Sequence, residues 1–228
     1  MSARGLFITG TDTGVGKTVI ACALTRAFVA RGERVAVMKP IASGAARTPQ
    51  GLSNEDALAL MEASNVALPY PKVNPFCFEP AVSPHIAAKE ANVWIDKTKI
   101  ATEYAALAAV SDRVIVEGAG GWLAPIGETE TMADLARALG LPALLVVALR
   151  LGCLNHAALT RRAIEAARVP FAGWIANVPG AAMEREAENL ATLTTSLGGP
   201  PLAVQRFAPQ SARTLVLTQA AAQLAARA

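Results

Sequence analysis

The sequence lacks the features that mark membrane proteins, disulfide-rich secreted domains and metal–thiolate sites. Only three cysteines occur in 228 residues, and no two of them form a Cys-x-x-Cys pair, so neither a zinc site nor a dithiol redox site is indicated. The longest apolar run, Ala143–Leu149, has the length of a strand and is too short to span a bilayer. Because the cysteine count is odd and no secretory signal stands out, we expect a cytoplasmic protein without membrane contacts.

A strong charge of either sign is also absent. The chain has 21 Lys and Arg residues against 18 Asp and Glu residues, a net charge of +3, and no block of basic residues. This balance argues against a nucleic-acid partner and is sufficient for a small anionic ligand. A hydrophobic content of 53% with 17% charged residues is typical of a compact globular protein, and the length indicates one domain over residues 1–228.

The signatures of zinc peptidases, serine hydrolases and Rossmann dehydrogenases are missing as well. The chain does contain a glycine loop, Gly14-Val15-Gly16-Lys17-Thr18, between the apolar run Leu6–Thr9 and an alanine-rich helical segment. The N–H groups of such a loop and the dipole of the following helix favour phosphate. Lys17 is expected to reach the β- and γ-phosphates and Thr18 to bind Mg²⁺, so the loop predicts a nucleoside triphosphate site.

The spacing of this loop differs from the usual G-x-x-x-x-G-K-[ST] pattern. The pattern places a glycine at position 11, where this chain has Thr11, and Gly10 lies one residue too far from Gly16. The alternative interpretation is a glycine-rich turn that enters a helix and carries its lysine by chance. The order of strand, loop and helix favours the phosphate-binding interpretation.

Short apolar runs alternate with helical patterns along the whole chain. This alternation predicts a P-loop NTPase-type α/β fold with a doubly wound, mostly parallel sheet and helices on both faces. The expected strands are Leu6–Thr9, Val35–Met38, Val114–Val116, Ala143–Leu149, Ala172–Ala176 and Leu202–Val204. The expected helices are Thr18–Arg31, Glu55–Ala63, Thr98–Val110, Met132–Leu139, Asn155–Ala167, Met183–Leu197 and Leu215–Ala226. The proline-rich segment Leu68–Val82 interrupts the alternation and is predicted to be a long loop.

Ligands of open α/β sheets bind at the carboxyl ends of the strands, which singles out the residues just after each predicted strand. Lys39 follows the second strand and is either a second cation beside the phosphates or a solvated surface lysine; Ser43, further on, could donate to a substrate. Glu117 ends the third strand and is either a Mg²⁺ ligand or part of a turn. Asp56 begins a short helix, where an acidic residue is favoured by the helix dipole alone.

Two further positions follow later strands. Gly152 precedes a predicted helix and marks a second possible anion site, in which Asn155 is either a ligand contact or the helix N-cap. Asn177 could read a base edge with its amide, or simply form a turn.

Together these blocks resemble the dethiobiotin synthetase family, in which the lengthened glycine loop is the usual form. The blocks that follow the loop are more specific than Gly-Lys-Thr. The resemblance is carried, in chain order, by Thr9-Gly10-Thr11-Asp12-Thr13-Gly14-Val15-Gly16-Lys17-Thr18, Met38-Lys39-Pro40-Ile41-Ala42-Ser43-Gly44, Asn54-Glu55-Asp56-Ala57-Leu58, Ser83-Pro84-His85, Val116-Glu117-Gly118-Ala119-Gly120-Gly121-Trp122, Leu151-Gly152-Cys153-Leu154-Asn155-His156-Ala157 and Gly173-Trp174-Ile175-Ala176-Asn177.

The resemblance implies an ATP-dependent ring closure. Diaminopelargonate (7,8-diaminononanoate), CO₂ or bicarbonate, and MgATP give dethiobiotin, ADP and phosphate through a carbamate and a carbamic-phosphoric mixed anhydride. It implies Lys17 and Lys39 as catalytic cations and Thr18, Asp56 and Glu117 as contacts of Mg²⁺. Nucleotide contacts are implied for Gly14, Val15, Gly16, Lys17, Thr18, Val19, Asp56, Glu117, Gly118, Ala119, Gly120 and Asn177, the last with adenine. Substrate contacts are implied for Thr13, Lys39, Ser43, Gly152, Cys153, Leu154 and Asn155.

The segment Gly152–Asn155 matches the part of the family that binds the substrate's carboxylate tail from the partner subunit, which implies a homodimer. The chain departs from the family pattern at Gly14, where many members carry a larger or acidic residue. The match also thins after Asn177, and residues 205–209 do not clearly match the adenine-side loop.

Four rival classes fit the glycine loop less well. A partitioning-type ATPase would carry a second lysine early in the loop, where this chain has Thr11, Asp12 and Thr13. A cobalamin-pathway amidating ligase would add a glutaminase domain, for which 228 residues leave no room. A nucleotide kinase would show an arginine-rich lid, and a GTP-binding switch would show Asn-Lys-x-Asp in place of Asn177-Val178-Pro179-Gly180.

Overall fold

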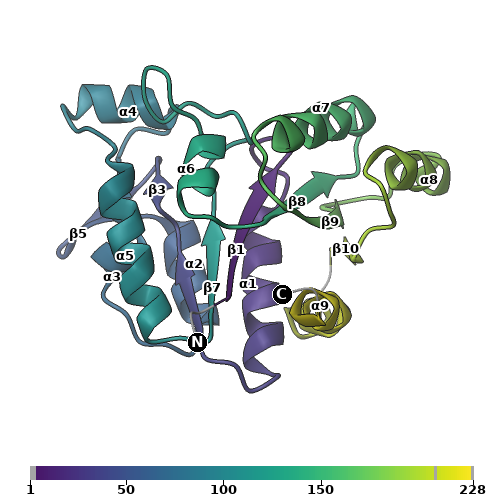
Figure 1. The fold of residues 1–228 in the computed structure, drawn as a ribbon, viewed down its shortest axis with the longest axis horizontal. Coiled ribbons are helices and arrows are strands. Elements are labelled where there is room, and N and C mark those ends of the chain that lie inside the picture. Colours follow the sequence, from purple (N-terminus) through teal and green to yellow (C-terminus); the bar gives the residue numbers. More distant parts are fainter. Residues whose placement is uncertain (1–3, 208–209, 227–228) are drawn as a thin grey trace.

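The computed structural model describes residues 4–207 and 210–226, and its centre is a parallel sheet of six strands (Figure 1). The strands are β1 (Arg4–Gly10), β2 (Val35–Met38), β7 (Arg113–Glu117), β8 (Ala143–Ala148), β9 (Phe171–Val178) and β10 (Ala203–Arg206). They lie in the order β10-β9-β8-β1-β7-β2, and each neighbouring pair is parallel. The predicted doubly wound sheet is confirmed, and every predicted strand overlaps an observed one.

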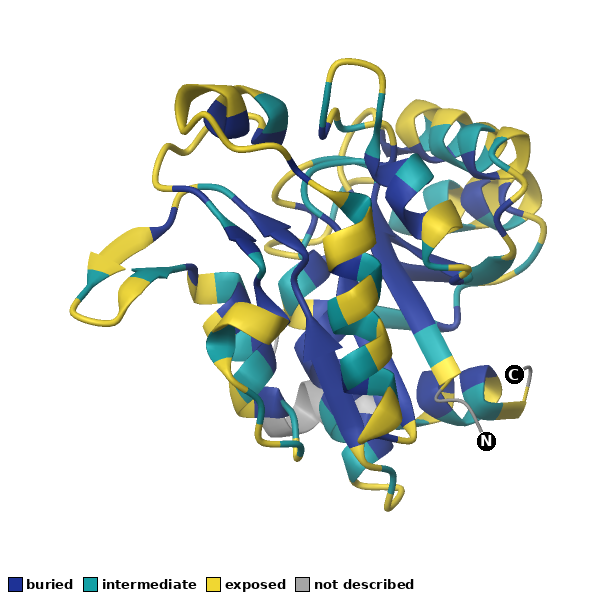
Figure 2. Ribbon diagram, turned by 60° about the vertical axis from the view of Figure 1, so that its left-hand side comes forward, coloured by how far each residue is buried: buried dark blue, intermediate teal, exposed yellow. Residues whose placement is uncertain are grey.

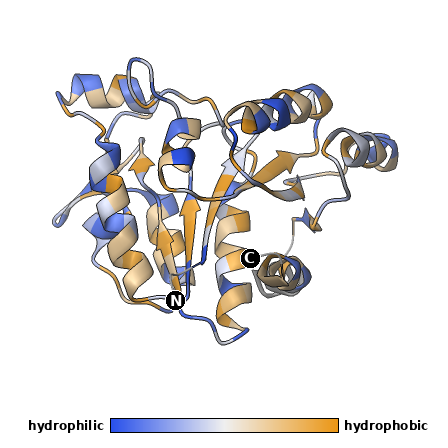
Figure 3. Ribbon diagram, in the orientation of Figure 1, coloured by the Kyte–Doolittle hydropathy of each residue, from blue (hydrophilic) through white to orange (hydrophobic). Residues whose placement is uncertain are grey.

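Helices cover both faces of the sheet. One face carries α1 (Lys17–Val29), α2 (Glu55–Ala63) and α9 (Gln210–Ala226), and the other carries α5 (Lys97–Ala109), α6 (Met132–Ala138), α7 (Cys153–Ala166) and α8 (Glu186–Ser196). Alternate strand residues face the two layers: Leu6 and Ile8 pack with α1, whereas Phe7 packs with α5 and α6. Strands β2, β7 and β8 are buried along their whole length, and most strand residues are apolar on both faces, as the dark blue and orange ribbons show (Figures 2 and 3).

The region between β2 and α5 holds short elements that the sequence patterns did not predict. They are β3 (Ile41–Ala42), β4 (Ala46–Thr48), β5 (Gly51–Ser53), α3 (Tyr70–Val73), β6 (Phe76–Cys77) and α4 (Pro84–Glu90). Strands β4 and β5 form an antiparallel hairpin, and β3 pairs with β6 in parallel. These elements lie together on one side of the molecule in Figure 1.

The prediction of an uninterrupted loop over Leu68–Val82 was wrong, because this segment contains α3 and β6. Its prolines do not prevent helix formation, since Pro69 and Pro71 stand at the N-cap and in the first turn of α3, where no N–H is needed. Asn74 then donates from Nδ2 to the main-chain oxygens of Lys39 at 2.6 Å and Phe76 at 3.2 Å. The segment is thus fastened to the chain that leaves β2.

The strand order decides which loops meet. Strand β1 lies between β8 and β7, and β2 follows on the far side of β7. In the β2–β7 register Met38 lies opposite Val116, so that the residues just beyond them, Lys39 and Glu117, lie at the same level. The glycine loop, Lys39 and Glu117 consequently lie together at the carboxyl ends of the strands, as expected for a parallel α/β protein.

Candidate functional site

Except for the buried Val15, the predicted site residues from the first half of the chain line one cavity of about 870 Å³ at the carboxyl ends of the strands. The cavity brings together the glycine loop, the chain after β2, the start of α2, the start of α4 and the segment after β7. Its walls include Thr13, Gly14, Gly16, Lys17, Thr18, Val19, Lys39, Ser43, Asp56, Glu117, Ala119 and Gly120. Residues separated by more than 100 positions in the sequence thus form a single cavity.

The glycine loop owes its shape to two residues in the left-handed region. Gly14 has φ 72° and Gly16 has φ 93°, values that favour glycine over any other residue. Val15 between them is fully buried. Gly16 is also the N-cap of α1, so the free N–H groups of the first helical turn face the cavity. This is the geometry that binds phosphate at a helix N-terminus.

Lys17 is buried with its ammonium directed at the loop itself. Nζ donates to the main-chain oxygen of Asp12 at 2.9 Å. Burial, and secondarily the positive charge of Lys39, lower the pKa of Lys17 to about 8. The carboxylate of Asp12 accepts from Thr13 N at 2.7 Å and pairs with Arg150 Nη2 at 2.8 Å, which connects the loop to the end of β8.

Lys39 and Glu117 are buried and form an ionic cluster with Asp56, whose side chain is 44% exposed. The ammonium of Lys39 lies 2.8 Å from Asp56 Oδ2 and 2.6 Å from Glu117 Oε1, and Thr18 Oγ1 donates to the same Glu117 oxygen at 2.9 Å. Burial lowers the pKa of Lys39, but the charges and hydrogen bonds of Glu117 and Asp56 outweigh it, so the pKa lies above its ordinary value. Asp56 shows the reverse: burial raises its pKa, and Lys39 brings it below the ordinary value. Both shifts favour the charged forms of Lys39 and Asp56.

The N-terminal cap of helix α2 fixes the position of Asp56. Asn54 is the N-cap of this helix and accepts hydrogen bonds from Asp56 N and Ala57 N. Its own N–H donates to Tyr70 Oη at 2.8 Å, and Tyr70 Oη donates to Asn74 Oδ1 at 2.8 Å. Sequence reasoning missed Tyr70 and Asn74 as supports of the site. The cluster of prolines around them was the only available signal.

The donors present fit a magnesium ion. Thr18, Asp56 and Glu117 supply one hydroxyl and two carboxylates, the oxygen donors that Mg²⁺ binds beside nucleotide phosphates. Glu117 is fully buried, and its Oε2 has no hydrogen-bond partner among the residues that the structure describes. A buried carboxylate oxygen without a donor is costly, and a metal ion or a water bound to one would satisfy it.

Two predicted residues lie behind the cavity wall. Gly118 packs on the ring of Phe7, where a Cβ atom would come within 3.0 Å. Asn177 is buried at the end of β9 beneath the glycine loop, and its Nδ2 donates to the main-chain oxygen of Val15 at 2.8 Å. The structure thus places Asn177 against the phosphate loop; the predicted contact with adenine stays a prediction.

The segment Gly152–Asn155 does not line this cavity. Gly152 has φ 92° and is the N-cap of α7, so Asn155 is not the cap. Cys153 is buried, whereas Gly152 and Asn155 are exposed. The neighbouring Leu151 is 97% exposed, an unusual position for a large apolar side chain.

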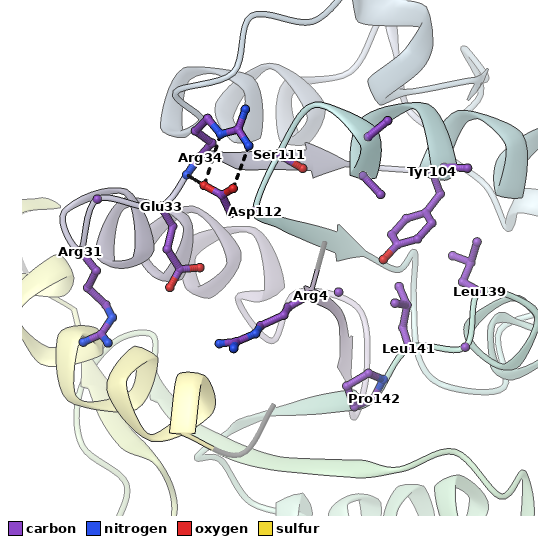
Figure 4. Close-up of a pocket in the computed structure, with 16 residues that line it drawn as sticks. Arg4, Arg31, Glu33, Arg34, Tyr104, Ser111, Asp112, Leu139, Leu141 and Pro142 are labelled. Atoms are coloured by element: carbon purple, nitrogen blue, oxygen red, sulfur yellow. Dashed lines mark hydrogen bonds and ion pairs between the residues drawn. The ribbon is translucent and has the colours of Figure 1, made fainter. Parts of the chain in front are cut away.

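A second hollow of about 1090 Å³ lies at the opposite edge of the sheet (Figure 4). Its charged groups are largely paired: Arg34 binds Asp112 through two nitrogens, and Glu33 accepts from Arg113. Helices α1, α5 and α6 all end there, so their negative dipole ends face the hollow and disfavour phosphate. The smaller cavity at the carboxyl ends of the strands is therefore the candidate triphosphate site.

Fold and glycine loop together define a P-loop nucleotide-binding protein. The chain is similar in structure to a chain of the MinC:MinD cell division protein complex from Aquifex aeolicus, with a TM-score of 0.62, 14% identity and coverage of 99% of this chain and 97% of that one. It is also similar to a ParA family ATPase from Chlorobium tepidum, with a TM-score of 0.57, 15% identity and coverage of 99% and 94%. At these identities the likeness shows the fold alone.

Sequence comparison gives the family. Residues 4–208 match the model of an AAA domain family, AAA_26. Over 197 residues, 86% of each chain, the sequence is 48% identical to the ATP-dependent dethiobiotin synthetase BioD of Pseudomonas paraeruginosa. Over 202 residues, 89% of each chain, it is 46% identical to BioD 1 of Escherichia coli O157:H7. The chain belongs to the ATP-dependent dethiobiotin synthetase family, a family of ligases, which confirms the resemblance.

Within residues 4–207 and 210–226, no helix combines the length and the apolarity that a membrane crossing requires.

Proposed function

We propose that this chain closes the ureido ring of dethiobiotin from diaminopelargonate, CO₂ and ATP. One amine of the substrate adds to CO₂ and forms a carbamate. The carbamate oxygen takes the γ-phosphoryl group of ATP and releases ADP. The second amine then attacks the carbonyl carbon of this mixed anhydride, phosphate leaves with the oxygen, and the ring closes.

The observation that carries the proposal is the meeting of Lys39 with the phosphate loop and two carboxylates in one cavity. Phosphoryl transfer to a carbamate brings two anions together, so the site must supply positive charge where the transfer occurs. Lys17 and Lys39 supply two cations from the chain. A protein that only binds ATP would need Lys17 of the phosphate loop. Lys39 lies outside that loop, on the same side of the cavity as Ser43, where a second reactant could bind.

Thr18, Asp56 and Glu117 would hold Mg²⁺. When bound, the ion offsets the charge of the phosphates that it contacts. Gly14, Gly16 and Val19 line the phosphate side of the cavity, and Ala119 and Gly120 line its wall after β7. Thr13 and Ser43 lie at the same cavity and are proposed to contact the substrate.

We further propose a homodimer in which Gly152–Asn155 binds the carboxylate tail of the substrate held by the other subunit. Two observations support it. The segment opens helix α7 yet lies outside its own chain's cavity, and the side chain of Leu151 beside it is almost fully exposed. A cytoplasmic location remains our expectation, in line with three cysteines that are all free thiols.

The test is the complete reaction. Purified protein is incubated with diaminopelargonate, bicarbonate and MgATP, and dethiobiotin and ADP are measured together. We expect equal amounts of both, and a Lys39→Ala variant that folds normally but forms almost no dethiobiotin. Lys72→Ala is the matched control, because Lys72 is an exposed lysine on α3 that lies outside the cavity. ATP hydrolysis that ignores the diamine would contradict the proposed function.

A further inference from the structure

The ammonium group of Lys39 lies on the carboxylates that are proposed to hold Mg²⁺. Its Nζ atom is 2.8 Å from Asp56 Oδ2 and 2.6 Å from Glu117 Oε1. The side chains of Lys39 and Glu117 are only 5% and 1% exposed, so water contributes little to their contact, whereas the side chain of Asp56 is 44% exposed. A cation of the protein itself therefore pairs with one oxygen of each carboxylate proposed to hold Mg²⁺, and leaves Glu117 Oε2 without a partner.

The metal ion and the ammonium would compete for Asp56 Oδ2 and Glu117 Oε1, and a metal ion at the unpartnered Glu117 Oε2 would still lie close to the ammonium. Protein oxygens approach Mg²⁺ to about 2.0–2.1 Å, inside the distance at which they now contact the ammonium. A metal ion at Glu117 Oε1 would need space that Nζ now fills, and two cations at such separations repel strongly where water is scarce. Binding of one cation thus weakens the hold on the other.

The main chain of Lys39 is held by hydrogen bonds, whereas its side chain borders an open cavity into which it can rotate. Lys39 N donates to the oxygen of Val73 at 2.9 Å, and Lys39 O accepts from Asn74 Nδ2 at 2.6 Å. The side chain opens onto a cavity of about 870 Å³ that Lys17 and Ser43 also line. Rotation about side-chain bonds is sufficient to carry the ammonium from the carboxylates into the cavity.

The charges of the site favour this exchange only when a nucleotide is involved. Lys17 and Lys39 balance Asp56 and Glu117, so the four groups are neutral together. A divalent cation alone would leave two positive charges without partners. A divalent cation that arrives with a triphosphate brings more negative than positive charge, and the phosphates give the displaced ammonium a new partner.

We propose that Lys39 is a built-in counter-ion for Asp56 and Glu117, and that Mg²⁺ bound with ATP displaces its ammonium into the cavity. Lys39 then meets the carbamate and the transferred phosphoryl group only after the metal–nucleotide complex is seated. The identity of those reacting groups rests on the proposed function. The exchange itself rests on the ionic cluster and can be tested without the diamine.

The first experiment observes the ammonium directly. A buried, ion-paired lysine ammonium exchanges slowly with water, so it gives a proton–nitrogen NMR signal in protein labelled with ¹⁵N-lysine. The signal of Lys39 is assigned by its absence in Lys39→Met. We expect a non-hydrolysable ATP analogue to shift or remove this signal in the presence of Mg²⁺ and to leave it in place with EDTA. An unchanged signal with Mg²⁺, or an equal change with EDTA, would overturn the proposal.

The second experiment measures metal affinity without nucleotide. Free Mn²⁺ is followed by electron paramagnetic resonance in titrations of the wild type, Lys39→Met and Lys72→Met. Because Lys39→Met leaves Asp56 and Glu117 without their cation, we expect its affinity for Mn²⁺ to rise about tenfold or more. Lys72→Met removes the same charge from an exposed position and should behave as the wild type. Equal affinities of Lys39→Met and the wild type would count against the exchange.

The two proposals fail separately. If Lys39→Met does not fold, which circular dichroism would show, Lys39→Arg, which keeps the positive charge, assigns the signal instead, and the NMR titration of the wild type still decides the exchange. An NMR response of Lys39 to the Mg²⁺–nucleotide complex, combined with no dethiobiotin formation, would sink the proposed reaction and leave the exchange standing. Normal dethiobiotin formation with a Lys39 signal that does not change on addition of Mg²⁺ and nucleotide would support the proposed reaction and contradict the exchange.

Discussion

The side-chain amide of Asn177 donates a hydrogen bond of 2.8 Å to the main-chain oxygen of Val15. This bond joins the end of β9 to the phosphate loop after β1, across the intervening strand β8. A Cβ atom on Gly16 would come within 2.2 Å of the same amide nitrogen. The loop therefore rests on Asn177, and its glycine is required by this contact as well as by its backbone angles.

We predict that Asn177→Ala weakens the binding of ATP and of inorganic tripolyphosphate alike. The substitution leaves the buried oxygen of Val15 without a donor and loosens the loop that binds phosphate, so a loss of roughly tenfold is expected for both ligands. Isothermal titration calorimetry measures both affinities. A variant that binds tripolyphosphate normally and ATP weakly would show that Asn177 contacts the nucleotide base and does not support the phosphate loop.

Gly16→Ala should be far more damaging than Gly14→Ala, although both residues have positive φ angles. At Gly14 nothing lies within 4 Å of an added Cβ, so the cost is that of the backbone conformation, about 1–2 kcal/mol. At Gly16 the same cost is joined by a collision with Asn177. We expect Gly16→Ala to lose ATP binding and Gly14→Ala to retain it at reduced stability. Similar affinities of the two variants would refute the close packing described here.

The start of α6 offers a test of pH dependence. Asp134 Oδ2 accepts from Thr131 N at 2.9 Å and from Thr131 Oγ1 at 2.8 Å. Burial raises the pKa of Asp134, but these hydrogen bonds outweigh it and hold the pKa below the ordinary value of 3.8. Because the folded state favours the carboxylate, its contribution to stability is complete well above pH 3.8 and is lost as the pH falls through the lowered pKa.

Asp134→Asn is accordingly predicted to lower the free energy of unfolding by about 1 kcal/mol near pH 7. The difference from the wild type should shrink as the pH falls below about 4. Urea denaturation of both proteins at several pH values gives the difference. A gap that stays constant down to pH 3 would show that the carboxylate charge does not contribute.

The proposed dimer predicts an effect of Leu151→Asp on assembly. The chain mass is 23.6 kDa, so light scattering after gel filtration should give about twice this mass for the wild type. A charge at the fully exposed Leu151 should shift the protein toward the monomer and impair ring closure, because each site would lose the partner's segment. Val110→Asp, a similar change at a position that is 45% exposed at the end of α5, serves as the control. A wild type that is monomeric would contradict the dimer directly.

Local patterns were enough to predict most of the regular structure. Helix α2 spans Glu55–Ala63 as predicted, because the residue before it, Asn54, caps it by accepting hydrogen bonds from Asp56 N and Ala57 N. Strand β2 spans Val35–Met38 as predicted, because a short aliphatic run between polar residues has few alternatives. The short elements between β2 and α5 were not predictable in this way. Pairing of β3 with β6, for example, depends on contacts between residues more than 30 positions apart.

The candidate site shows the same division. The sequence by itself determined which residues carry the chemistry: the Gly-Lys-Thr loop, and the charged residues that directly follow apolar strands. Only the tertiary structure decided that Lys39 lies on Asp56 and Glu117, that Asn177 supports the loop at Val15, and that Gly152–Asn155 lies outside the cavity. The reason is physical. Loop and helix-cap conformations depend on neighbouring residues, whereas the order of strands in a sheet is set by how distant helices pack across it, and that order decides which strand ends meet.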